Sequence, residues 1–382
     1  MQSKKTLKVC SRCVSDKTVP GISFDTNGVC NYCHIHDKLE KEFPTGQEGQ
    51  KKFLEIVEKI KKDGRHNKKY DCVVGVSGGC DSSYLIYKVK EAGLRPLAVH
   101  FDNTWNTEVA TQNIQRVLKR LNIDLYTYVV DNEEYDDILR SFLKAGVKDI
   151  ECPTDIGLIG TLYRAAEKVG VRYILDGFSF RTEGIVPIDW CYMDGKYVES
   201  VHKQFGARKM KTYPNLRILN WLRWMLIKKI KRVRLLNYID YNKERVKKLL
   251  SEKFDWQWYG EKHAENRYTI FCDHYFWSKK FNMNFAQIEL SGLVRSGQIT
   301  KDEALRKMGN TKEFDTKEII DLVKKRLSFS DQEFEKIMNL PKKTYRDYKT
   351  YKPIFERYRW FFWLLYKMNL VPQSFYMKYT KK

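Results

Sequence analysis

The sequence predicts an α/β protein in which a doubly wound parallel sheet lies between a small metal-binding unit and a mainly helical, basic C-terminal region. Three features lead to this prediction. Short apolar runs alternate with segments of helix length between residues 71 and 175, a glycine-rich turn joins the first run to the next helix, and four cysteines are paired near the N-terminus. Such alternation is typical of parallel strands with helices on both faces, because parallel crossovers are almost always right-handed.

Length and composition narrow the class of protein. A chain of 382 residues has room for two domains and an appendage at roughly 100–200 residues per domain. Its 42% hydrophobic and 31% charged residues exclude a globally disordered chain. The longest apolar run, Trp360 to Tyr366, falls well short of the ~20 residues of a membrane-spanning helix. With no apolar signal core near Met1, we expect a cytoplasmic protein whose nine thiols stay reduced.

The first predicted element is a zinc ribbon. Two CxxC pairs separated by 16 residues supply four thiolates, which bind zinc as a tetrahedron at ~2.3 Å. The four are Cys10, Cys13, Cys30 and Cys33. A complete sulfur shell leaves no open position, so the zinc is expected to be structural, with an iron–sulfur cluster as the alternative. His34 and His36 are alternative ligands by position, but we interpret them as surface histidines beside the knuckle.

The elements that follow are predicted from hydrophobic periodicity. Helices are expected over 47–64, 82–91, 107–121 and 155–169, and strands over 71–76, 97–101, 125–130 and 171–175. After residue 200 the strand signal fades, and later helices begin at the capping-box patterns Thr300 with Glu303 and Ser330 with Glu333. We therefore expect a zinc ribbon over 1–45, the α/β domain over 46–200, a helical substrate or partner region over 201–310 and a basic helical extension over 311–382.

The net charge of the chain also changes near residue 200. Residues 1–200 hold 29 basic and 29 acidic side chains, whereas residues 201–382 hold 41 and 19 and so carry the whole net charge of +22. A basic surface suits RNA, an anionic lipid, or an anionic substrate or partner, and charge alone does not choose among them.

The strongest functional signal is the glycine-rich turn at residues 76–83, VSGGCDSS, between the first strand and its helix. Gly78 and Gly79 let the backbone turn tightly around an anion, and the helix behind them offers free N–H groups and a positive dipole end. Ser77, Ser82 and Ser83 add hydroxyl groups. No Walker lysine follows and no GxGxxG is present, so this is neither a P-loop NTPase nor a Rossmann loop. The turn therefore predicts a different polyphosphate site.

Residues 77–82, SGGCDS, resemble the pyrophosphate-binding loop (PP-loop) of the ATP-pyrophosphatase superfamily. The resemblance implies a PP-loop ATP-pyrophosphatase fold over 46–200 and cleavage of ATP between its α and β phosphates with Mg²⁺. It also implies that Asp81 binds the Mg²⁺ or orients the phosphates. The residues that would hold pyrophosphate are Ser77, Gly78, Gly79, Ser82 and Ser83.

Further motifs narrow the resemblance. After the double CxxC and the loop come residues 101–106, FDNTWN; 240–243, DYNK; 260–267, GEKHAENR; and 290–298, LSGLVRSGQ. In this order, from Cys10 to about residue 310, the chain resembles the N-acetyl sugar amidotransferases of bacterial surface-polysaccharide (lipopolysaccharide, O-antigen) synthesis. Thr104 departs from the pattern, since Gly is expected there. The resemblance implies conversion of an acetamido group into an acetamidino group at the expense of ATP, which is released as AMP and pyrophosphate.

Candidate site residues follow from these motifs. The catalytic candidates are Asp81, Lys262, His263, Glu265 and Arg267. If their segment is helical, Lys262, Glu265 and Arg267 lie within two turns, where the two cations would bind phosphate or a sugar carboxylate. His263 would transfer a proton at neutral pH, and a solvated charged helix is the alternative.

Strand ends supply further candidates, because ligands of such sheets bind outside the carboxyl ends of the strands. Asp102 and Asn103 end the second strand and are expected to contact the nucleotide. The run 176–179, DGFS, ends the fourth strand and is a weaker candidate on the same argument.

The partners are expectations of the same kind. The substrate would be a nucleotide-linked N-acetyl sugar. No glutaminase unit is evident, so the resemblance implies ammonia from a separate glutaminase, with a barrel-shaped, cyclase-like companion. A tRNA-thiolating PP-loop enzyme is the alternative function, but its usual additional cysteine pair is missing, and we do not expect nucleic acid among the partners. The basic, aromatic segments 216–236 and 359–370 suggest peripheral membrane contact, with packed interface helices as the alternative for the first.

Overall fold

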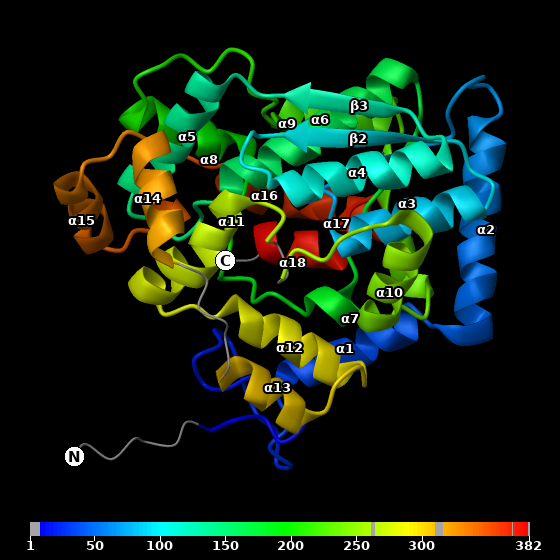
Figure 1. Ribbon diagram of the computed structural model, residues 1–382, viewed down its shortest axis with the longest axis horizontal. Coiled ribbons are helices and arrows are strands. Elements are labelled where there is room, and N and C mark those ends of the chain that lie inside the picture. Colours follow the sequence, from blue (N-terminus) through cyan, green and yellow to red (C-terminus); the bar gives the residue numbers. More distant parts are fainter. Residues whose placement is uncertain (1–7, 261–263, 310–315, 369, 381–382) are drawn as a thin grey trace.

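A computed structural model describes residues 8–260, 264–309, 316–368 and 370–380 of the chain (Figure 1). Its centre is a five-stranded parallel sheet in the order β3-β2-β1-β4-β5. The strands are β1 (Cys72–Gly75), β2 (Pro96–Asp102), β3 (Leu125–Val129), β4 (Tyr173–Leu175) and β5 (Lys231–Val233). The predicted α/β class with a parallel sheet is confirmed.

Two separate cores cover the faces of the sheet. The register pairs Val73 with Leu97 on one face and Val74 with Ala98 on the other, and all four side chains are buried. The Val74 face packs on α2 (Gly46–Gly64), α3 (Cys80–Glu91), α4 (Glu108–Leu121) and α10 (Lys243–Phe254). The Val73 face packs on α6 (Cys152–Val169). Burial on both faces explains why the central strands are apolar throughout instead of alternating.

The strand order places a reversal point at the centre of the sheet. From β1 the chain moves through β2 to β3, and then returns to pair β4 with the other side of β1. At such a point the two crossovers leave in opposite directions, which opens a crevice at the carboxyl ends of the neighbouring strands. The glycine loop follows β1 directly, so it lies at this position.

Several elements differ from those expected from the sequence. The helices that were not anticipated are α1 (Asn31–Glu42), α5 (Asn132–Lys144), α7 (Phe180–Glu183) and α8 (Gly195–Phe205), and β5 lies beyond residue 200, in the part expected to be helical. The segment 216–236 divides into α9 (Ile218–Leu222), a π-helical turn (Arg223–Ile227), β5 and a 3₁₀ turn (Leu235–Tyr238). Strand β5 is a charged edge strand, and it forms because β4 offers it a backbone partner, which hydrophobic periodicity does not report.

The rest of the C-terminal half is helical, as predicted. Its further helices are α11 (Arg267–Phe271), a π-helix (Cys272–Phe281), α12 (Phe285–Arg295), α13 (Lys301–Gly309), α14 (Thr316–Arg326), α15 (Asp331–Asn339), α16 (Lys352–Arg357), α17 (Arg359–Lys367) and α18 (Gln373–Thr380). Both expected capping boxes form, with reciprocal bonds between Ser330 and Glu333 and between Thr300 and Glu303. Within the described residues, none of the helices is both long and apolar enough to span a membrane.

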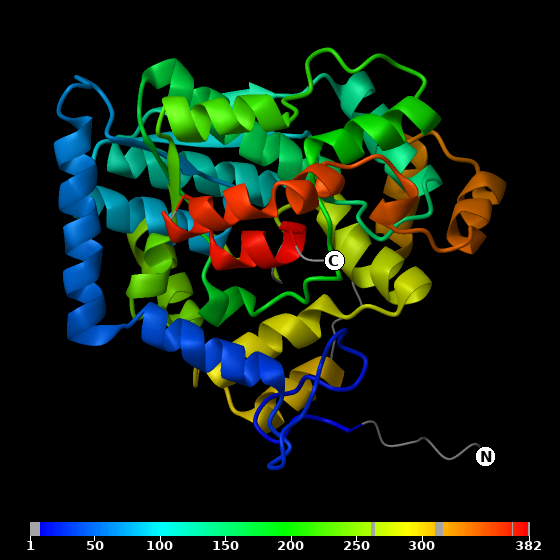
Figure 2. The same cartoon turned by 180° about the vertical axis from the view of Figure 1, so that it is seen from behind.

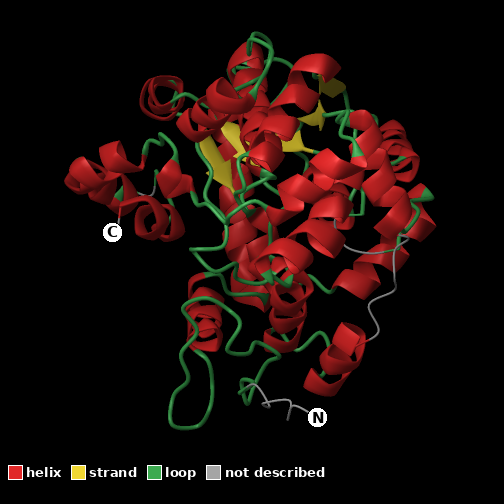
Figure 3. Ribbon diagram, turned by 90° about the vertical axis from the view of Figure 1, so that its left-hand side faces the viewer, coloured by secondary structure: helices red, strands yellow, loops and turns green. Residues whose placement is uncertain are grey.

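Two groups of helices lie outside the sheet layers. The cysteine knuckle and α1 (Asn31–Glu42) lie against α12 and α13 at the bottom of Figure 1. Helices α16, α17 and α18 lie at the back of the view in Figure 1 and come to the front in Figure 2, where they are coloured orange to red. Figure 3 shows this C-terminal group at the periphery of the molecule.

Candidate active site and cysteine centre

The glycine loop is held in one conformation by α4. Gly79 is the N-cap residue of α3, and Gly78 has φ +82°, in the region that favours glycine. A Cβ atom on Gly78 would lie 2.1 Å from the carbonyl oxygen of Ala110. Trp256 and Asn113 bind the Gly78 carbonyl from the outer side, through Nε1 at 3.0 Å and Nδ2 at 3.4 Å. The loop is therefore pre-shaped rather than free to adapt.

The serine hydroxyls lie inside this turn. The Ser77 backbone N–H donates to Ser82 Oγ at 3.2 Å, and the Gly79 N–H donates to Ser77 Oγ at 3.3 Å. Ser83 is buried in the first turn of α3, and its N–H donates to the Gly79 carbonyl at 3.1 Å. All five residues predicted to hold pyrophosphate thus share one loop at the N-terminus of a helix, the geometry that suits an anion.

Asp81 faces a second cluster, contributed by the segment after β5. The Tyr241 hydroxyl donates to Asp81 Oδ1, and the Thr182 hydroxyl approaches the same oxygen at 3.5 Å. Lys243 is buried nearby with its Nζ 2.9 Å from Glu289 Oε1. Although burial opposes the charge, the carboxylates of Glu289 and Asp81 raise the pKa of Lys243 above its usual value. A fixed cation therefore lies close to the predicted metal-binding carboxylate.

Tyr241 and Lys243 are site residues that sequence reasoning did not assign, although both belong to the motif DYNK at 240–243. The motif marked the segment, but only the fold brings it to the loop. There, Gln298 Nε2 binds the Tyr241 carbonyl at 3.1 Å, which fixes the segment against the residues that follow α12.

Glu265 comes to the loop from the opposite side. Its Oε1 accepts a long hydrogen bond from Ser77 Oγ at 3.4 Å, and its backbone carbonyl accepts the Thr107 N–H at 2.9 Å. Its Oε2 is buried with no hydrogen-bond partner among the residues that the structure describes. An orphaned buried carboxylate oxygen beside a phosphate loop fits a Mg²⁺ ligand, since Mg²⁺ prefers carboxylate and phosphate oxygens.

The other catalytic candidates fall in different places. Lys262 and His263 lie outside the described residues. Arg267 is exposed, and its backbone N–H binds the Trp105 carbonyl at 2.8 Å. The described part of this motif is not helical before Arg267, where α11 begins, so the condition for placing Glu265 and Arg267 within two turns of one helix is not met. Before it, Asn266 forms an antiparallel bridge with Asn106, so the segment is pinned to the loop after β2.

The end of β2 holds that segment in place. Asn103 Oδ1 accepts hydrogen bonds from the Trp105 N–H at 3.1 Å and from Asn266 Nδ2 at 2.9 Å. Asp102 Oδ1 accepts the Thr104 N–H at 2.8 Å and Asn106 Nδ2 at 3.2 Å. Asn103 is buried, and its Oδ1 is used to hold the loop and the Asn266 segment together. Asp102 is half-buried at the edge of the site.

Thr104 occupies a left-handed conformation, with φ +61°, where the family resemblance leads us to expect glycine. The strained residue is clamped by Arg326 of α14, whose guanidinium donates to its carbonyl and hydroxyl oxygens. The same guanidinium lies 4.1 Å from the Trp105 ring and binds Asp136 with its Nε at 2.8 Å. The C-terminal extension therefore supports the loop that follows β2.

The end of β4 carries a charged group that was only a weak candidate from the sequence. Asp176 Oδ2 accepts a 2.5 Å hydrogen bond from Arg232 and lies 3.7 Å from Arg234 Nε. Although burial opposes its charge, these two arginines lower the pKa of Asp176. The charges of Asp155 and Glu183 also act on Arg232 and Arg234 respectively, so the two guanidinium groups lie among three carboxylates. Gly177, which follows Asp176 in sequence, lies against the backbone of Ser82, which joins this group to the loop.

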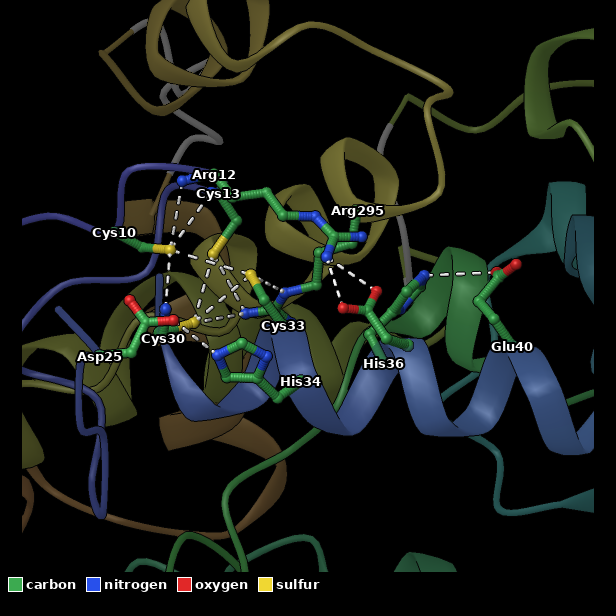
Figure 4. Close-up of polar contacts among 11 residues, drawn as sticks. Cys10, Arg12, Cys13, Asp25, Cys30, Cys33, His34, His36, Glu40 and Arg295 are labelled. Carbon is green, nitrogen blue, oxygen red and sulfur yellow. Dashed lines mark hydrogen bonds and ion pairs between the residues drawn. The ribbon is translucent and has the colours of Figure 1, made fainter. Parts of the chain in front are cut away.

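The cysteine centre lies away from the loop and is shown in Figure 4. All four Sγ atoms lie within 4.8 Å of one another and are buried. Three of their separations are 3.8 Å (Cys10–Cys33), 3.7 Å (Cys13–Cys30) and 3.6 Å (Cys30–Cys33). Four sulfurs bound tetrahedrally at 2.3 Å would be about 3.8 Å apart, so the thiols already have the spacing of a zinc site.

Two features of the centre could not be read from the CxxC spacing. Arg295 of α12 reaches the sulfurs, with Nη2 3.2 Å from Cys13 Sγ and Nε 3.4 Å from Cys33 Sγ (Figure 4). His34 is half-exposed and binds Asp25 at 2.9 Å, as expected of a surface histidine. His36 differs from the expectation: it is buried, and its ring packs edge-on against Phe180.

In the cysteine centre, the positive charge of Arg295 lies against the negative charge of the thiolates. Hydrogen bonds from the thiols of Cys10, Cys30 and Cys33 lower the pKa of Cys13 well below its usual value. Although burial opposes its charge, Cys13 and Cys33 raise the pKa of Arg295. A four-thiolate zinc site carries a net negative charge, and the buried guanidinium offsets part of it.

We expect Arg295→Met to weaken metal binding by roughly 10- to 100-fold, the usual effect of losing a partner of the metal ligands. The reason is that methionine fills the volume but leaves the thiolate charge without its cation. Competition with a colorimetric zinc chelator measures the change. The matched control is Arg357→Met on exposed α16, which should retain the parent affinity; equal affinities for the two variants would contradict the role given to Arg295.

The sheet order, the glycine loop and the four-cysteine knuckle together define a PP-loop α/β protein with an N-terminal metal-binding unit. Residues 265–362 match the family model described as "LPS biosynthesis protein WbpG-like, C-terminal domain". This segment is thus similar to a family of lipopolysaccharide biosynthesis proteins, in agreement with the resemblance to enzymes of surface-polysaccharide synthesis.

Curated relatives match part of the chain. An uncharacterized protein of Methanocaldococcus jannaschii is 29% identical over 170 residues, which cover 44% of this chain and 58% of that protein. A tRNA-specific 2-thiouridylase of Proteus mirabilis is 32% identical over 134 residues, covering 31% and 36%. The chain thus spans less than two thirds of either relative. Among solved structures, the NH₃-dependent NAD synthetase of Campylobacter jejuni gives a TM-score of 0.31 at 13% identity, covering 77% of this chain and 97% of that one.

Proposed function

We propose that the protein is an ATP-dependent amidotransferase that converts the acetamido group of a nucleotide-linked N-acetyl sugar into an acetamidino group. One observation carries the proposal: Glu265, the first residue of the WbpG-like segment, contacts Ser77 of the PP-loop. The segment that matches a lipopolysaccharide biosynthesis family therefore contributes directly to the candidate phosphate site, and this supports a sugar as the substrate.

The proposed reaction has two steps: adenylation of the amide oxygen, and then displacement of AMP by ammonia. Amide resonance makes the carbonyl carbon unreactive toward ammonia, so the amide oxygen first attacks the α-phosphorus of ATP and expels pyrophosphate. Ammonia then adds to the carbon of the O-adenylyl imidate. The carbon–oxygen bond breaks, a proton is lost, and AMP leaves with the original amide oxygen, so that the product carries NH where the substrate carried O.

The residues of the site suit these steps. The loop N–H groups and serines would hold the pyrophosphate, and Lys243 would offset negative charge that develops as it separates. Asp81 and Glu265 would hold Mg²⁺, which supplies charge neutralisation at the phosphate oxygens when bound. We assign the diphosphate of the sugar nucleotide to Arg232 and Arg234, because guanidinium groups bind phosphates and these two lie with Asp176 at the carboxyl end of β4, beside the loop.

A tRNA-thiolating enzyme is the second candidate, favoured by the thiouridylase match and by the basic charge. The cysteines outside the knuckle argue against it. Burial raises the pKa of Cys80 to about 12 and that of Cys191 to about 12, and it raises the pKa of Cys72, Cys152 and Cys272. Buried thiols with raised pKa values are poor nucleophiles, so none of these suits sulfur transfer.

The test uses the full chain with ATP, Mg²⁺, ammonium chloride and a panel of UDP-linked N-acetyl amino sugars that carry heavy oxygen in the acetamido carbonyl. We expect heavy oxygen to appear in AMP, together with a sugar in which NH replaces O. Ammonium should support turnover and glutamine alone should not, because the ammonia is assigned to a separate glutaminase, with a barrel-shaped companion. AMP formed only when tRNA is added would favour the thiolating enzyme instead.

A matched pair of variants tests the role of the site in the same assay. Glu265→Gln keeps the shape of the side chain but removes the charge assigned to Mg²⁺, so we expect roughly a hundredfold lower turnover and a higher Mg²⁺ requirement. Its melting temperature should not fall, because Glu265 Oε2 has no hydrogen-bond partner among the described residues to lose. Glu335→Gln on the exposed face of α15 is the control. An unchanged Mg²⁺ dependence in Glu265→Gln would refute the assignment.

A further inference from the structure

Helix α17 presents an apolar face to the outside of the molecule. Phe362 and Leu365 point inward and are each 2% exposed. On the other side, Trp360, Trp363 and Leu364 are 63%, 44% and 42% exposed. The spacing i, i+3, i+4 places these three side chains on one face of the helix, and Met368 extends it by a turn. We call the four residues the α17 face.

A second exposed apolar group lies on a neighbouring element. Trp221 of α9 packs against Phe362 and Phe375, with ring centroids 6.5 and 5.2 Å apart, so α9 is fixed beside α17 and α18. Leu219 of α9 is 77% exposed, and Ile227 at the end of the π-helical turn is 71% exposed. Monomeric soluble proteins rarely expose neighbouring large apolar side chains of this number without a partner.

Basic side chains predominate around the α17 face, because residues 352–380 contain five basic and one acidic. The single acidic residue, Glu356, is paired with Lys352 at 3.3 Å. Residues 216–234 contain seven basic and no acidic side chains, but acidic residues of other elements pair with five of them: Arg217, Arg223, Lys228, Arg232 and Arg234. Lys367 leans over the Trp363 ring at 5.5 Å, which leaves its ammonium group at the rim of the apolar face. We therefore expect a partner that offers an apolar region to the α17 face and negatively charged groups to the basic side chains around it.

An anionic lipid bilayer has this chemistry. Tryptophans lie at the headgroup level, aliphatic side chains reach the acyl boundary, and lysines or arginines bind the lipid phosphates. We propose that the α17 face, with the adjoining α9, docks the protein on the surface of an anionic membrane. The contact is peripheral, since no helix among the described residues is able to span the bilayer. It does not depend on the proposed enzymatic function.

The experiment is flotation of the full chain with vesicles. We expect co-flotation with phosphatidylcholine vesicles that contain phosphatidylglycerol, weak flotation with pure phosphatidylcholine, and release as salt screens the charges. Trp360→Ser combined with Trp363→Ser should lower the vesicle partition coefficient about tenfold or more, because both aromatic anchors are lost. Both side chains are exposed, so the melting temperature should stay at the parent value.

The control is Leu54→Ser combined with Leu305→Ser, which removes two apolar side chains of similar exposure, 46% and 42%, from α2 and α13. It should float like the parent. Absence of flotation with anionic vesicles, or equal flotation of the tryptophan and leucine variants, would overturn the proposal. A parent that sediments as a dimer and a tryptophan variant that sediments as a monomer, neither of them floating, would assign the face to a second copy of the chain and also overturn it.

Discussion

Cys33→Ser is expected to release the metal and to unfold the N-terminal unit. The four thiols are fully buried, and α1 begins within the knuckle, directly after Cys30. Removing one ligand opens the sulfur shell and leaves the Arg295 charge buried without full compensation. Breaking such a buried charged group costs roughly 3–5 kcal/mol, which is a large part of the stability of a domain. Elemental analysis for bound zinc and the melting temperature measure the two effects.

The control for this variant is Cys191→Ser. Cys191 also carries a thiol but lies outside the cysteine group, so this variant should keep the zinc of the parent protein. Zinc that is retained in Cys33→Ser would contradict the four-thiolate site. Iron and sulfide with visible absorbance in the parent protein would instead identify the iron–sulfur alternative. Chelation of the parent protein should reproduce the loss of stability seen with Cys33→Ser.

The cysteine centre shows which parts of a site can be predicted from sequence. Local spacing was sufficient for the four ligands, because each CxxC pair is one turn of chain. Arg295 was not predictable, since 262 residues separate it from Cys33 and an arginine on a helix is ordinarily solvated. The same limit applies to His36, whose burial depends on Phe180 of a helix formed much later in the chain.

The candidate active site also contains a part that could be predicted from the sequence and a part that could not. The sequence was enough to predict the loop of residues 77–83, because glycines, serines and a strand–turn–helix pattern are contiguous. The motif at 260–267 was recognised, but whether it is helical was left open, and its described part before Arg267 is not helical. Asn266 pairs with Asn106 through backbone bonds, and this long-range contact outweighs the local preference of a charged segment for a helix. Lys243 was passed over because a lysine beside Glu244 reads as a surface residue until its burial is known.

The sheet itself was predicted wherever strands are buried on both faces. Strands β1, β2 and β4 are apolar, and each was expected at nearly its observed position. Strand β5, with the sequence Lys231-Arg232-Val233, has no apolar pattern and is held by its register with β4. This strand brings Arg232 and Arg234 to Asp176 at the carboxyl edge of the sheet, where the proposed site lies.

Gly78→Ala is expected to disable the loop, because the new methyl group cannot be accommodated where the glycine lies. Its Cβ would approach the carbonyl oxygen of Ala110 to 2.1 Å, and the atoms it meets belong to the backbone of α4 rather than to a movable side chain. Either α4 or the loop must shift. We expect a loss of about 3 kcal/mol in the free energy of unfolding from this overpacking. Misplacing the phosphate-binding N–H groups should lower pyrophosphate release roughly a hundredfold.

Gly46→Ala separates the steric effect from the cost of the backbone conformation. Gly46 has φ +66°, close to the value at Gly78, but a Cβ there would meet nothing within 4 Å. It should therefore lose only about 1 kcal/mol, the cost of a left-handed alanine, and keep its activity. Denaturant unfolding and pyrophosphate release, measured on both variants, compare the two glycines directly. If both lost the same stability and activity, the contact with α4 would not be what fixes the loop, and its shape would have to come from Ser77, Ser82 and the Trp256 bond alone.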